Sequence, residues 1–251
     1  INDPDLDGSF DVNKGLHVAR HLLLDIVSRG LPAGTEYLDP ITPQYIGDVV
    51  SWAAIGARTT ESQVHRQLAS GLSCPVGFKN NTDGSIKVAV DAVTSAMHPH
   101  IFLSITKAGH SAIFSSAGNP DCHVILRGGS ERTNYDADSI AQARSLMEAS
   151  GQARGVMVDM SHANSRKDHE RQKEVCAALC DQLRLGNRHL VGTMIESHLV
   201  AGRQDNVPGQ PLTYGRSITD ACLGWADTEV LLADLAEAVR ARRGTRAKAT
   251  A

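Results

Sequence analysis

Three cationic side chains with glycines beside them suggest an anion site. Arg58, Lys79 and Arg127 each follow an apolar run typical of a buried strand, and each lies within two residues of a glycine. Arginine offers a planar fork to a carboxylate or a phosphate, and lysine adds a compact charge that can give up a proton. Glycine lets backbone N–H groups approach the same anion. Because only Glu36 stands in a comparable position to neutralise these cations, we expect a dianionic or phosphorylated substrate.

A second group of side chains has the chemistry of a metal site. His162, Glu196, His198 and Asp220 combine imidazole with carboxylates, and Asp159 lies close to His162 in the sequence. This mixture suits a divalent metal that acts as a Lewis acid or orients a sugar-like oxygen. Glu196 and His198 are two residues apart and would share one face if a strand continues through them. Any two of these residues could instead form a structural hydrogen-bonded pair, so spacing leaves the ligand set open.

The elements that must position these groups alternate between strand and helix. Apolar residues at helical spacing predict helices, and short apolar runs bounded by glycine or proline predict strands. Buried strands are expected at residues 34–38, 52–57, 75–78, 123–126, 155–159 and 190–195, and an inserted hairpin at 100–105 and 112–114. Such alternation indicates a parallel sheet with helices outside it, either a closed barrel or an open doubly wound sheet.

The polar residues at the strand ends favour the barrel. In a closed parallel barrel the carboxyl ends of all strands meet at one mouth, whereas an open sheet uses mainly one crevice. The six ends carry Glu36, Arg58, Lys79, Arg127, Asp159 followed by His162, and Glu196 followed by His198. Structural salt bridges would explain one such charge equally well, but they account poorly for all six.

Composition excludes several classes of protein. The 251 residues contain 28 acidic and 25 basic side chains, and a net charge of -3 gives no general attraction to nucleic acid. No apolar run approaches the roughly 18 residues of a membrane span, and the 5 cysteines are typical of reduced thiols. We therefore predict a cytoplasmic protein with neither nucleic-acid nor membrane partners.

The domain organisation is predicted to be simple. No stretch is rich enough in proline, glycine or serine to act as a linker between two domains. Residues 1–251 are therefore expected to form a single α/β domain, with a loop at about 1–12, the inserted hairpin region at 100–121 and a flexible tail at 241–251.

Five longer blocks of sequence resemble one enzyme family. They are GARTTESQVHRQLASGLSCPVGFKN, ILRGGSERTNY, MVDMSHANSRKD, TMIESHLVAGRQ and YGRSITDACLGW. Over nearly its whole length the chain resembles the type I alpha 3-deoxy-D-arabino-heptulosonate 7-phosphate (DAHP) synthases. The resemblance implies a (β/α)8 TIM barrel that condenses phosphoenolpyruvate with erythrose 4-phosphate in the first step of the shikimate pathway. It also implies a divalent metal and the release of inorganic phosphate.

The resemblance gives the three cations a role. Arg58, Lys79 and Arg127, with the backbone at Ala57 and with Glu36 nearby, would hold phosphoenolpyruvate. Lys79 is the candidate for proton transfer, because crowding by two arginines should lower the pKa of its ammonium group.

The same resemblance places the metal ligands. They would be His162, Glu196 and Asp220, so that His198 is a neighbour of the metal site and not a ligand. A metal of the Mn, Fe, Co or Zn class is expected.

Regulation and assembly are also implied by the resemblance, since members of the family are often inhibited by an aromatic amino acid and form dimers and tetramers. Pro43, Gln44, Ser73, Phe102 and Ser104 match the inhibitor-site positions. Ser104 resembles the phenylalanine-sensitive form more than the tyrosine-sensitive one. We therefore expect phenylalanine as inhibitor and a homodimer or homotetramer.

The chain departs from the family pattern at its start. It begins at Ile1, beyond the family's first two strands, which carry a cysteine metal ligand and a basic Lys-Pro-Arg-Thr segment. By this resemblance only strands 3 to 8 of the barrel are present, together with the inserted hairpin. A barrel without two adjacent strands has two unpaired edges, so we expect an N-terminally truncated chain that is inactive alone.

Two further functions compete with the synthase. The chain could be a non-catalytic barrel remnant that binds a phosphorylated metabolite or a partner chain, or a metal-dependent phosphoester hydrolase. The presence of His162, Glu196 and Asp220 argues against a decayed site. A phosphatase would not need three cations beside a separate metal cluster.

Overall fold

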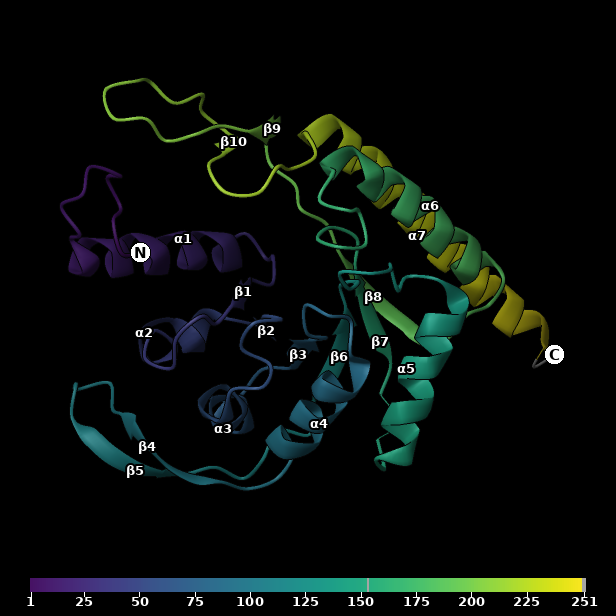
Figure 1. Ribbon diagram of the computed structural model, residues 1–251, viewed down its shortest axis with the longest axis horizontal. Coiled ribbons are helices and arrows are strands. Elements are labelled where there is room, and N and C mark those ends of the chain that lie inside the picture. Colours follow the sequence, from purple (N-terminus) through teal and green to yellow (C-terminus); the bar gives the residue numbers. More distant parts are fainter. Residues whose placement is uncertain (153, 250–251) are drawn as a thin grey trace. The chain divides into compact units, whose positions relative to one another are not determined.

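The computed structural model describes residues 1–152 and 154–249, which fall into two compact units (Figure 1). Unit 1 comprises residues 1–81 and 87–124, and unit 2 comprises residues 82–86 and the chain from residue 125 onward. Strand β6 (Cys122–Leu126) contains the boundary between them. Each unit is described by itself below.

Unit 1 contains three strands that are each followed by a helical segment, and then a hairpin. The elements are α1 (Val12–Ser28), β1 (Gly34–Glu36), α2 (Pro43–Ile46), the 3-10 helix η1 (Gly47–Val49), β2 (Trp52–Ile55), α3 (Gln63–Gly71), β3 (Val76–Lys79), most of α4 (Ile86–Ala96), β4 (Ile101–Ile105) and β5 (Ser111–Ser115). Strand β2 pairs in parallel with both β1 and β3. Helix α1 begins where the Asp11 carboxylate accepts a hydrogen bond from the backbone N–H of Lys14, as an N-cap does.

Unit 2 continues the alternation. Its elements are α5 (Ala137–Ala149), β7 (Val156–Asp159), the 3-10 helix η2 (His169–Arg171), α6 (Gln172–Arg184), β8 (Leu190–Met194), β9 (Val200–Arg203), β10 (Arg216–Ser217) and α7 (Trp225–Ala249). Strands β7 and β8 pair in parallel, and α6 packs along α7 (Figure 1). Among the described residues, no helix is both long enough and apolar enough to cross a membrane.

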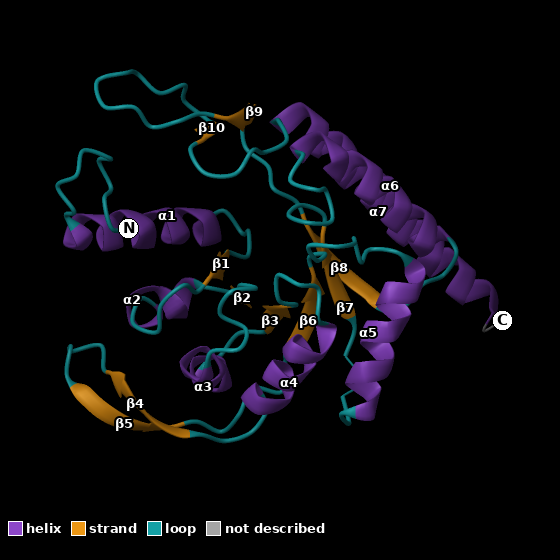
Figure 2. Cartoon of the chain, in the orientation of Figure 1, coloured by secondary structure: helices purple, strands orange, loops and turns teal. Residues whose placement is uncertain are grey.

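The order of the six main strands is β1-β2-β3-β6-β7-β8, the same as their order in the chain. Parallel strands require a crossover connection, and a helix supplies it in each repeat (Figure 2). The sequence-based expectation of a parallel α/β fold with six strands is confirmed. The hairpin expected near residues 100–121 is present as the antiparallel pair β4 and β5.

The strands are buried on both faces, which explains their continuous apolar runs. In unit 1 the side chains of Ile55, Val76 and Phe78 have no exposed surface, and in unit 2 the same holds for Val156 and Val158. A polar side chain at the end of such a strand therefore stands out as a candidate for function.

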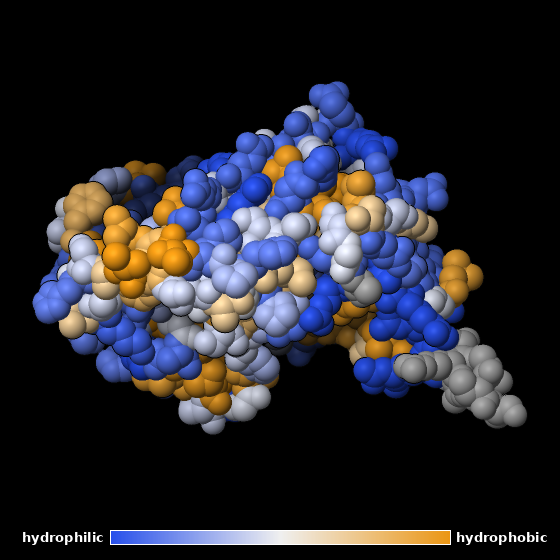
Figure 3. All heavy atoms as spheres, turned by 90° about the horizontal axis from the view of Figure 1, so that it is seen from below, coloured by the Kyte–Doolittle hydropathy of each residue, from blue (hydrophilic) through white to orange (hydrophobic). Residues whose placement is uncertain are grey.

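The β4–β5 hairpin presents different residues on its two faces. Phe102 and Phe114 face each other across the pair, with ring centroids 5.9 Å apart. On the opposite face Ile101, Leu103 and Ile113 are 75%, 76% and 75% exposed. Figure 3, which views the molecule from below Figure 1, shows hydrophobic side chains gathered on this side.

Several boundaries differ from the sequence-based expectation. Strand β1 ends at Glu36 and β2 at Ile55, each two residues before the expected end, and β8 ends at Met194, one residue before it. The tail expected to be flexible at 241–251 continues helix α7 through Ala249, while residues 250–251 lie outside the described part.

Candidate metal and substrate site

His162 lies in the loop after β7, where two side chains contact its ring. Asp159, the last residue of β7, is 1% exposed, and its Oδ2 lies 2.9 Å from His162 Nδ1. The Ser161 hydroxyl lies 2.8 Å from the same nitrogen. His162 has a φ of 54°, which is uncommon outside glycine, and its carbonyl accepts a hydrogen bond of 2.8 Å from the N–H of Lys167. The loop thus holds the ring with Nε2 toward Glu196.

Glu196 and Asp220 come from two segments that are joined by backbone hydrogen bonds. The Leu223 N–H donates to the Glu196 carbonyl at 3.0 Å, and the His198 N–H donates to the Leu223 carbonyl at 2.9 Å. Ser197 and Leu223 form a parallel bridge. This pairing beyond the end of β8 brings the segment that begins at Asp220 beside Glu196.

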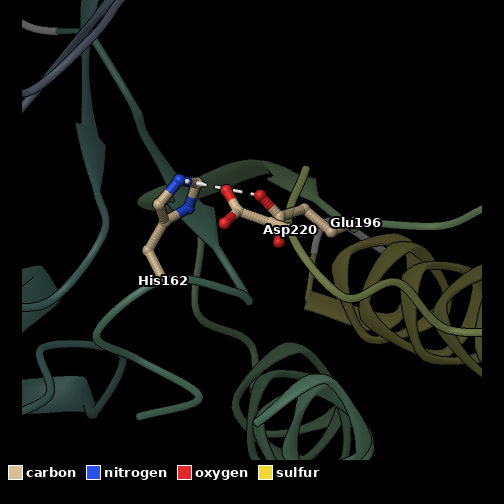
Figure 4. A group of neighbouring side chains, drawn as sticks. All are labelled: His162, Glu196 and Asp220. Carbon is tan, nitrogen blue, oxygen red and sulfur yellow. Dashed lines mark ion pairs between the residues drawn. The ribbon is translucent and has the colours of Figure 1, made fainter. Parts of the chain in front are cut away.

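The three predicted ligands converge within unit 2. One ligand atom from each of His162, Glu196 and Asp220 lies within 4.8 Å of the other two. Figure 4 shows the imidazole and the two carboxylates pointing toward one another, and Nε2 of His162 lies 3.6 Å from Oε1 of Glu196. Burial raises the pKa of Glu196, His162 opposes this shift, and the charges of Asp159 and Asp220 add to it.

This donor set fits a divalent cation. One imidazole nitrogen and two carboxylate oxygens suit the first-row metals that accept mixed nitrogen and oxygen ligands. The carboxylates of Glu196, Asp220 and Asp159 gather beside a single imidazole, and a bound dication would relieve their mutual repulsion. Asp159 would act as the carboxylate that orients a metal-ligating histidine through its other ring nitrogen.

His198 does not belong to this cluster. Its Nδ1 accepts a hydrogen bond of 2.8 Å from the N–H of Leu199. The residue lines a pocket of about 510 Å³ with Ser197, Trp225 and Leu232. Because β8 ends at Met194, the two-residue spacing from Glu196 no longer places both side chains on one face.

The predicted substrate residues of unit 1 include an ion pair between a buried lysine and an exposed glutamate. Lys79 is 4% exposed at the end of β3, and its Nζ lies 3.3 Å from Oε2 of Glu36 at the end of β1. Ala57 and the exposed Arg58 follow β2 in the turn that begins at Gly56. The carboxyl ends of three neighbouring strands therefore supply these groups.

Thr60 is a supporting residue that the sequence did not predict. It has no exposed surface, and its Oγ1 lies 3.0 Å from the Gly56 carbonyl and 2.7 Å from the Lys79 carbonyl. Its own N–H also donates to Gly56. One threonine thus joins the turn that carries Arg58 to the strand end that carries Lys79.

Arg127 lies in unit 2, where two buried asparagines hold its backbone. Gly128, at φ 79°, donates to Asn134 Oδ1 at 2.7 Å, and the Asn134 N–H donates to Asn164 Oδ1 at 2.8 Å. The Asn164 N–H donates to the Arg127 carbonyl, and its side-chain amide donates to the Asp159 carbonyl at 2.9 Å. A Cβ at Gly128 would lie 2.7 Å from the Asn164 nitrogen, so glycine is required there. The loops that carry Arg127 and His162 are therefore tied together.

The predicted site residues are divided between the two units. Glu36, Ala57, Arg58 and Lys79 lie in unit 1, whereas Arg127 and the cluster around His162 lie in unit 2. Their convergence on one cavity stays a prediction.

Two of the five predicted inhibitor residues line a pocket within unit 1. Phe102 and Ser104 contribute to a cavity of about 260 Å³ between the hairpin and helix α3, which supplies Val64 and Leu68. The remaining three, Pro43, Gln44 and Ser73, do not line it. Pro43 and Gln44 belong to the short helix α2, and Ser73 follows α3.

Parallel strands joined by helices, with a His-Glu-Asp cluster beyond the strand ends, are typical of α/β enzymes that bind a divalent metal. The family model of the DAHP synthetase I family matches residues 1–233. The chain belongs to this family.

Individual relatives agree with the family match. The "Phospho-2-dehydro-3-deoxyheptonate aldolase, Phe-sensitive" of Escherichia coli (strain K12) is 60% identical over 244 residues, which cover 97% of this chain and 69% of the relative. The "Phospho-2-dehydro-3-deoxyheptonate aldolase" of Haemophilus influenzae is 57% identical over 243 residues, which cover 97% of this chain and 67% of the relative. The solved structure of the Francisella tularensis SCHU S4 aldolase superposes with a TM-score of 0.94 at 52% identity, covering 96% of this chain and 70% of that one. The expectation of a partial TIM barrel is confirmed.

Proposed function

We propose that the protein catalyses the condensation of phosphoenolpyruvate with erythrose 4-phosphate and water, giving DAHP and inorganic phosphate. We do not retain the expectation that the chain is inactive alone, because the comparisons do not support it. Family membership supports this activity, which opens the shikimate pathway to the aromatic amino acids. The observation that carries the proposal is the convergence of His162, Glu196 and Asp220 in a chain that also keeps the cations Arg58, Lys79 and Arg127 at strand ends.

The cations would bind phosphoenolpyruvate. Arg58 and Arg127 present guanidinium forks for its carboxylate and phosphate, and the backbone at Ala57 supplies a further donor. Lys79 lies buried beside Glu36, which limits the directions in which its ammonium can point. The arrangement favours a ligand that carries two anionic groups.

The chemistry requires one new carbon–carbon bond. C3 of phosphoenolpyruvate attacks the aldehyde carbon of erythrose 4-phosphate, and the aldehyde oxygen takes up a proton. Water adds to C2 of the former phosphoenolpyruvate, and the phosphate group leaves as inorganic phosphate. When bound, the divalent metal supplies a Lewis acid for the aldehyde oxygen. Lys79 is the proposed proton donor, because an ammonium group held at the substrate can deliver its proton to a developing alkoxide.

The metal would be held by His162, Glu196 and Asp220. The Asp159 carboxylate and the Ser161 hydroxyl lie beside Nδ1 of His162, and the Leu223 N–H donates to the Glu196 carbonyl. These contacts support a preformed site for a metal of the Mn, Fe, Co or Zn class.

Feedback inhibition by phenylalanine is the proposed regulation. The Escherichia coli relative is named Phe-sensitive, and the pocket lined by Phe102 and Ser104 combines an aromatic ring with a hydroxyl group. We place the inhibitor in this pocket and expect a weaker effect of tyrosine and tryptophan. The exposed apolar face of the hairpin, formed by Ile101, Leu103 and Ile113, supports assembly as a homodimer or homotetramer. The buried thiols Cys74, Cys122, Cys176 and Cys180 support a cytoplasmic location.

The proposal is tested by following phosphoenolpyruvate absorbance and phosphate release together, with Mn²⁺ present. A synthase consumes phosphoenolpyruvate only after erythrose 4-phosphate is added, and it releases one phosphate per phosphoenolpyruvate. A hydrolase would release phosphate without the aldehyde. Binding of phosphoenolpyruvate without turnover, measured by calorimetry, would favour a non-catalytic binding protein.

A further inference from the structure

Gln172 makes an unusual pair of hydrogen bonds with the backbone of Glu196. Its side chain has no exposed surface, and it is the first residue of helix α6. The Glu196 N–H donates to Gln172 Oε1 at 2.8 Å, and Gln172 Nε2 donates to the Glu196 carbonyl at 3.0 Å. One amide therefore satisfies both backbone polar groups of this residue, in the way that a neighbouring strand would.

The position of Glu196 explains why such a partner is needed. Strand β8 ends at Met194, so the ladder between β7 and β8 stops before Glu196. A buried backbone group without a partner is costly. The Leu223 N–H reaches only the carbonyl of Glu196, and Gln172 supplies the acceptor for its N–H.

Gln172 also contacts the 3-10 helix η2 (His169–Arg171), which follows the His162 loop. Its Nε2 donates to the His169 carbonyl at 3.3 Å. The same amide therefore contacts one chain segment downstream of His162 and the backbone of Glu196. Removing this side chain would leave the Glu196 N–H without the acceptor that the structure gives it.

We propose that Gln172 is a positioning residue for the metal site, which sets the backbone of Glu196 relative to the His162 loop without touching the metal itself. The inference rests on the proposed metal role of Glu196. Supporting residues of this kind typically change metal affinity about 10- to 100-fold when they are replaced. A residue that served only to fill the core would change stability and leave the affinity of the folded protein unaltered.

The same helix supplies a matched control. Gln182 lies ten residues further along α6, is partly buried, and donates from Nε2 to the Tyr135 carbonyl at 2.8 Å. Gln182→Met therefore removes a comparable contact between a glutamine amide and the backbone, away from the three ligands. Gln172→Met removes both hydrogen bonds to Glu196 with little change in volume.

Each purified protein is titrated with Mn²⁺ alone, and electron paramagnetic resonance measures the free Mn²⁺ concentration, which gives the Kd. The melting temperature of each protein is recorded with and without Mn²⁺. We expect Gln172→Met to raise the Kd for Mn²⁺ about 10- to 100-fold, and Gln182→Met to leave it unchanged. Gln172→Glu, which keeps an acceptor for the Glu196 N–H, should fold and lose affinity as well, because its carboxylate cannot donate to the Glu196 carbonyl.

Three outcomes would overturn the inference. An unchanged Kd in a folded Gln172→Met or Gln172→Glu variant would show that Gln172 only fills the core. An equal loss of affinity in Gln182→Met would show that the effect is not specific to the ligand backbone. If the unaltered protein binds no Mn²⁺, the proposed metal site fails first, and the inference fails with it.

Discussion

The Oδ2 atom of Asp159 lies 2.9 Å from Nδ1 of His162, and this carboxylate is 1% exposed. Nε2 of the same ring lies 3.6 Å from Oε1 of Glu196. Asp159→Asn keeps an acceptor for the Ser161 N–H and removes the charge beside the ring. We expect Mn²⁺ affinity to fall about 10-fold or more, measured by calorimetry, while the exposed Asp181→Asn leaves it unchanged. Equal affinities in the two variants would contradict this role.

Lys79 provides a second prediction. Lys79→Met keeps most of the buried volume and removes the ammonium, so turnover should fall by about 10²- to 10⁴-fold, as expected for the loss of a proton-transfer group. Mn²⁺ affinity should remain unchanged. Lys87→Met is the control, since Lys87 is exposed on α4 and pairs only with Asp91 among the described residues. Normal turnover in Lys79→Met would exclude the role in proton transfer.

Thr60 hydrogen-bonds to the backbone beside Arg58 and Lys79, so replacing it tests whether that backbone positions the proposed anion site while both cations stay in place. Thr60→Val keeps the shape and removes the hydroxyl that lies 2.7 Å from the Lys79 carbonyl and 3.0 Å from the Gly56 carbonyl. The unfolding free energy should fall by about 1–3 kcal/mol, because a buried acceptor loses its donor. The KM for phosphoenolpyruvate should rise more than kcat falls. A loss of stability with an unchanged KM would limit Thr60 to a structural role.

The loop after β1 should show a defined pH dependence. Burial alone would raise the pKa of Asp39, but hydrogen bonds from the hydroxyl and N–H of Thr42 and from the N–H of Ile41 outweigh it and hold this pKa below 3.8. A lowered folded-state pKa adds stability that is present above the unfolded-state pKa and lost as the pH falls through the folded value.

Asp39→Ala should therefore reduce the unfolding free energy by about 1 kcal/mol at pH 7, because the hydrogen bonds from Ile41 and Thr42 to the carboxylate are lost. The difference from the unaltered protein should shrink as the pH is lowered below 3.8. Denaturant titrations at pH 7, 5 and 3 measure it. If the stability difference between Asp39→Ala and the unaltered protein grows as the pH falls, the folded-state pKa of Asp39 is raised and the prediction is wrong.

Much of the fold could be predicted because the local signals are strong. The apolar runs that became β2, β3 and β7 are buried on both faces, so hydrophobicity alone located them. The alternation with helices then determined the parallel sheet. The ends of the strands were less predictable. At Glu36 and Glu196 the backbone hydrogen bonds decide whether a strand continues, and the pattern of side chains does not show them.

Residue type and family motifs predicted which side chains form the metal site, but not the contacts that hold them in place. His162, Glu196 and Asp220 were found from their chemistry and from the family motifs, and they converge. The exclusion of His198 could not follow from spacing, because the backbone leaves regular strand geometry after Met194. The contacts of Asn164 with Leu126 and Asn134, and of Gln172 with Glu196, are also invisible in sequence, since each joins segments that are far apart in the chain.

We predict that phosphoenolpyruvate held by Arg58, Lys79 and Arg127 binds close to a metal held by His162, Glu196 and Asp220. The direct measurement is the ³¹P relaxation of bound phosphoenolpyruvate with Mn²⁺ in the metal site. We expect strong paramagnetic broadening in the unaltered protein and its loss in Glu196→Gln, in which calorimetry still detects phosphoenolpyruvate binding. Bound phosphoenolpyruvate whose phosphorus is not broadened by bound Mn²⁺ would contradict it.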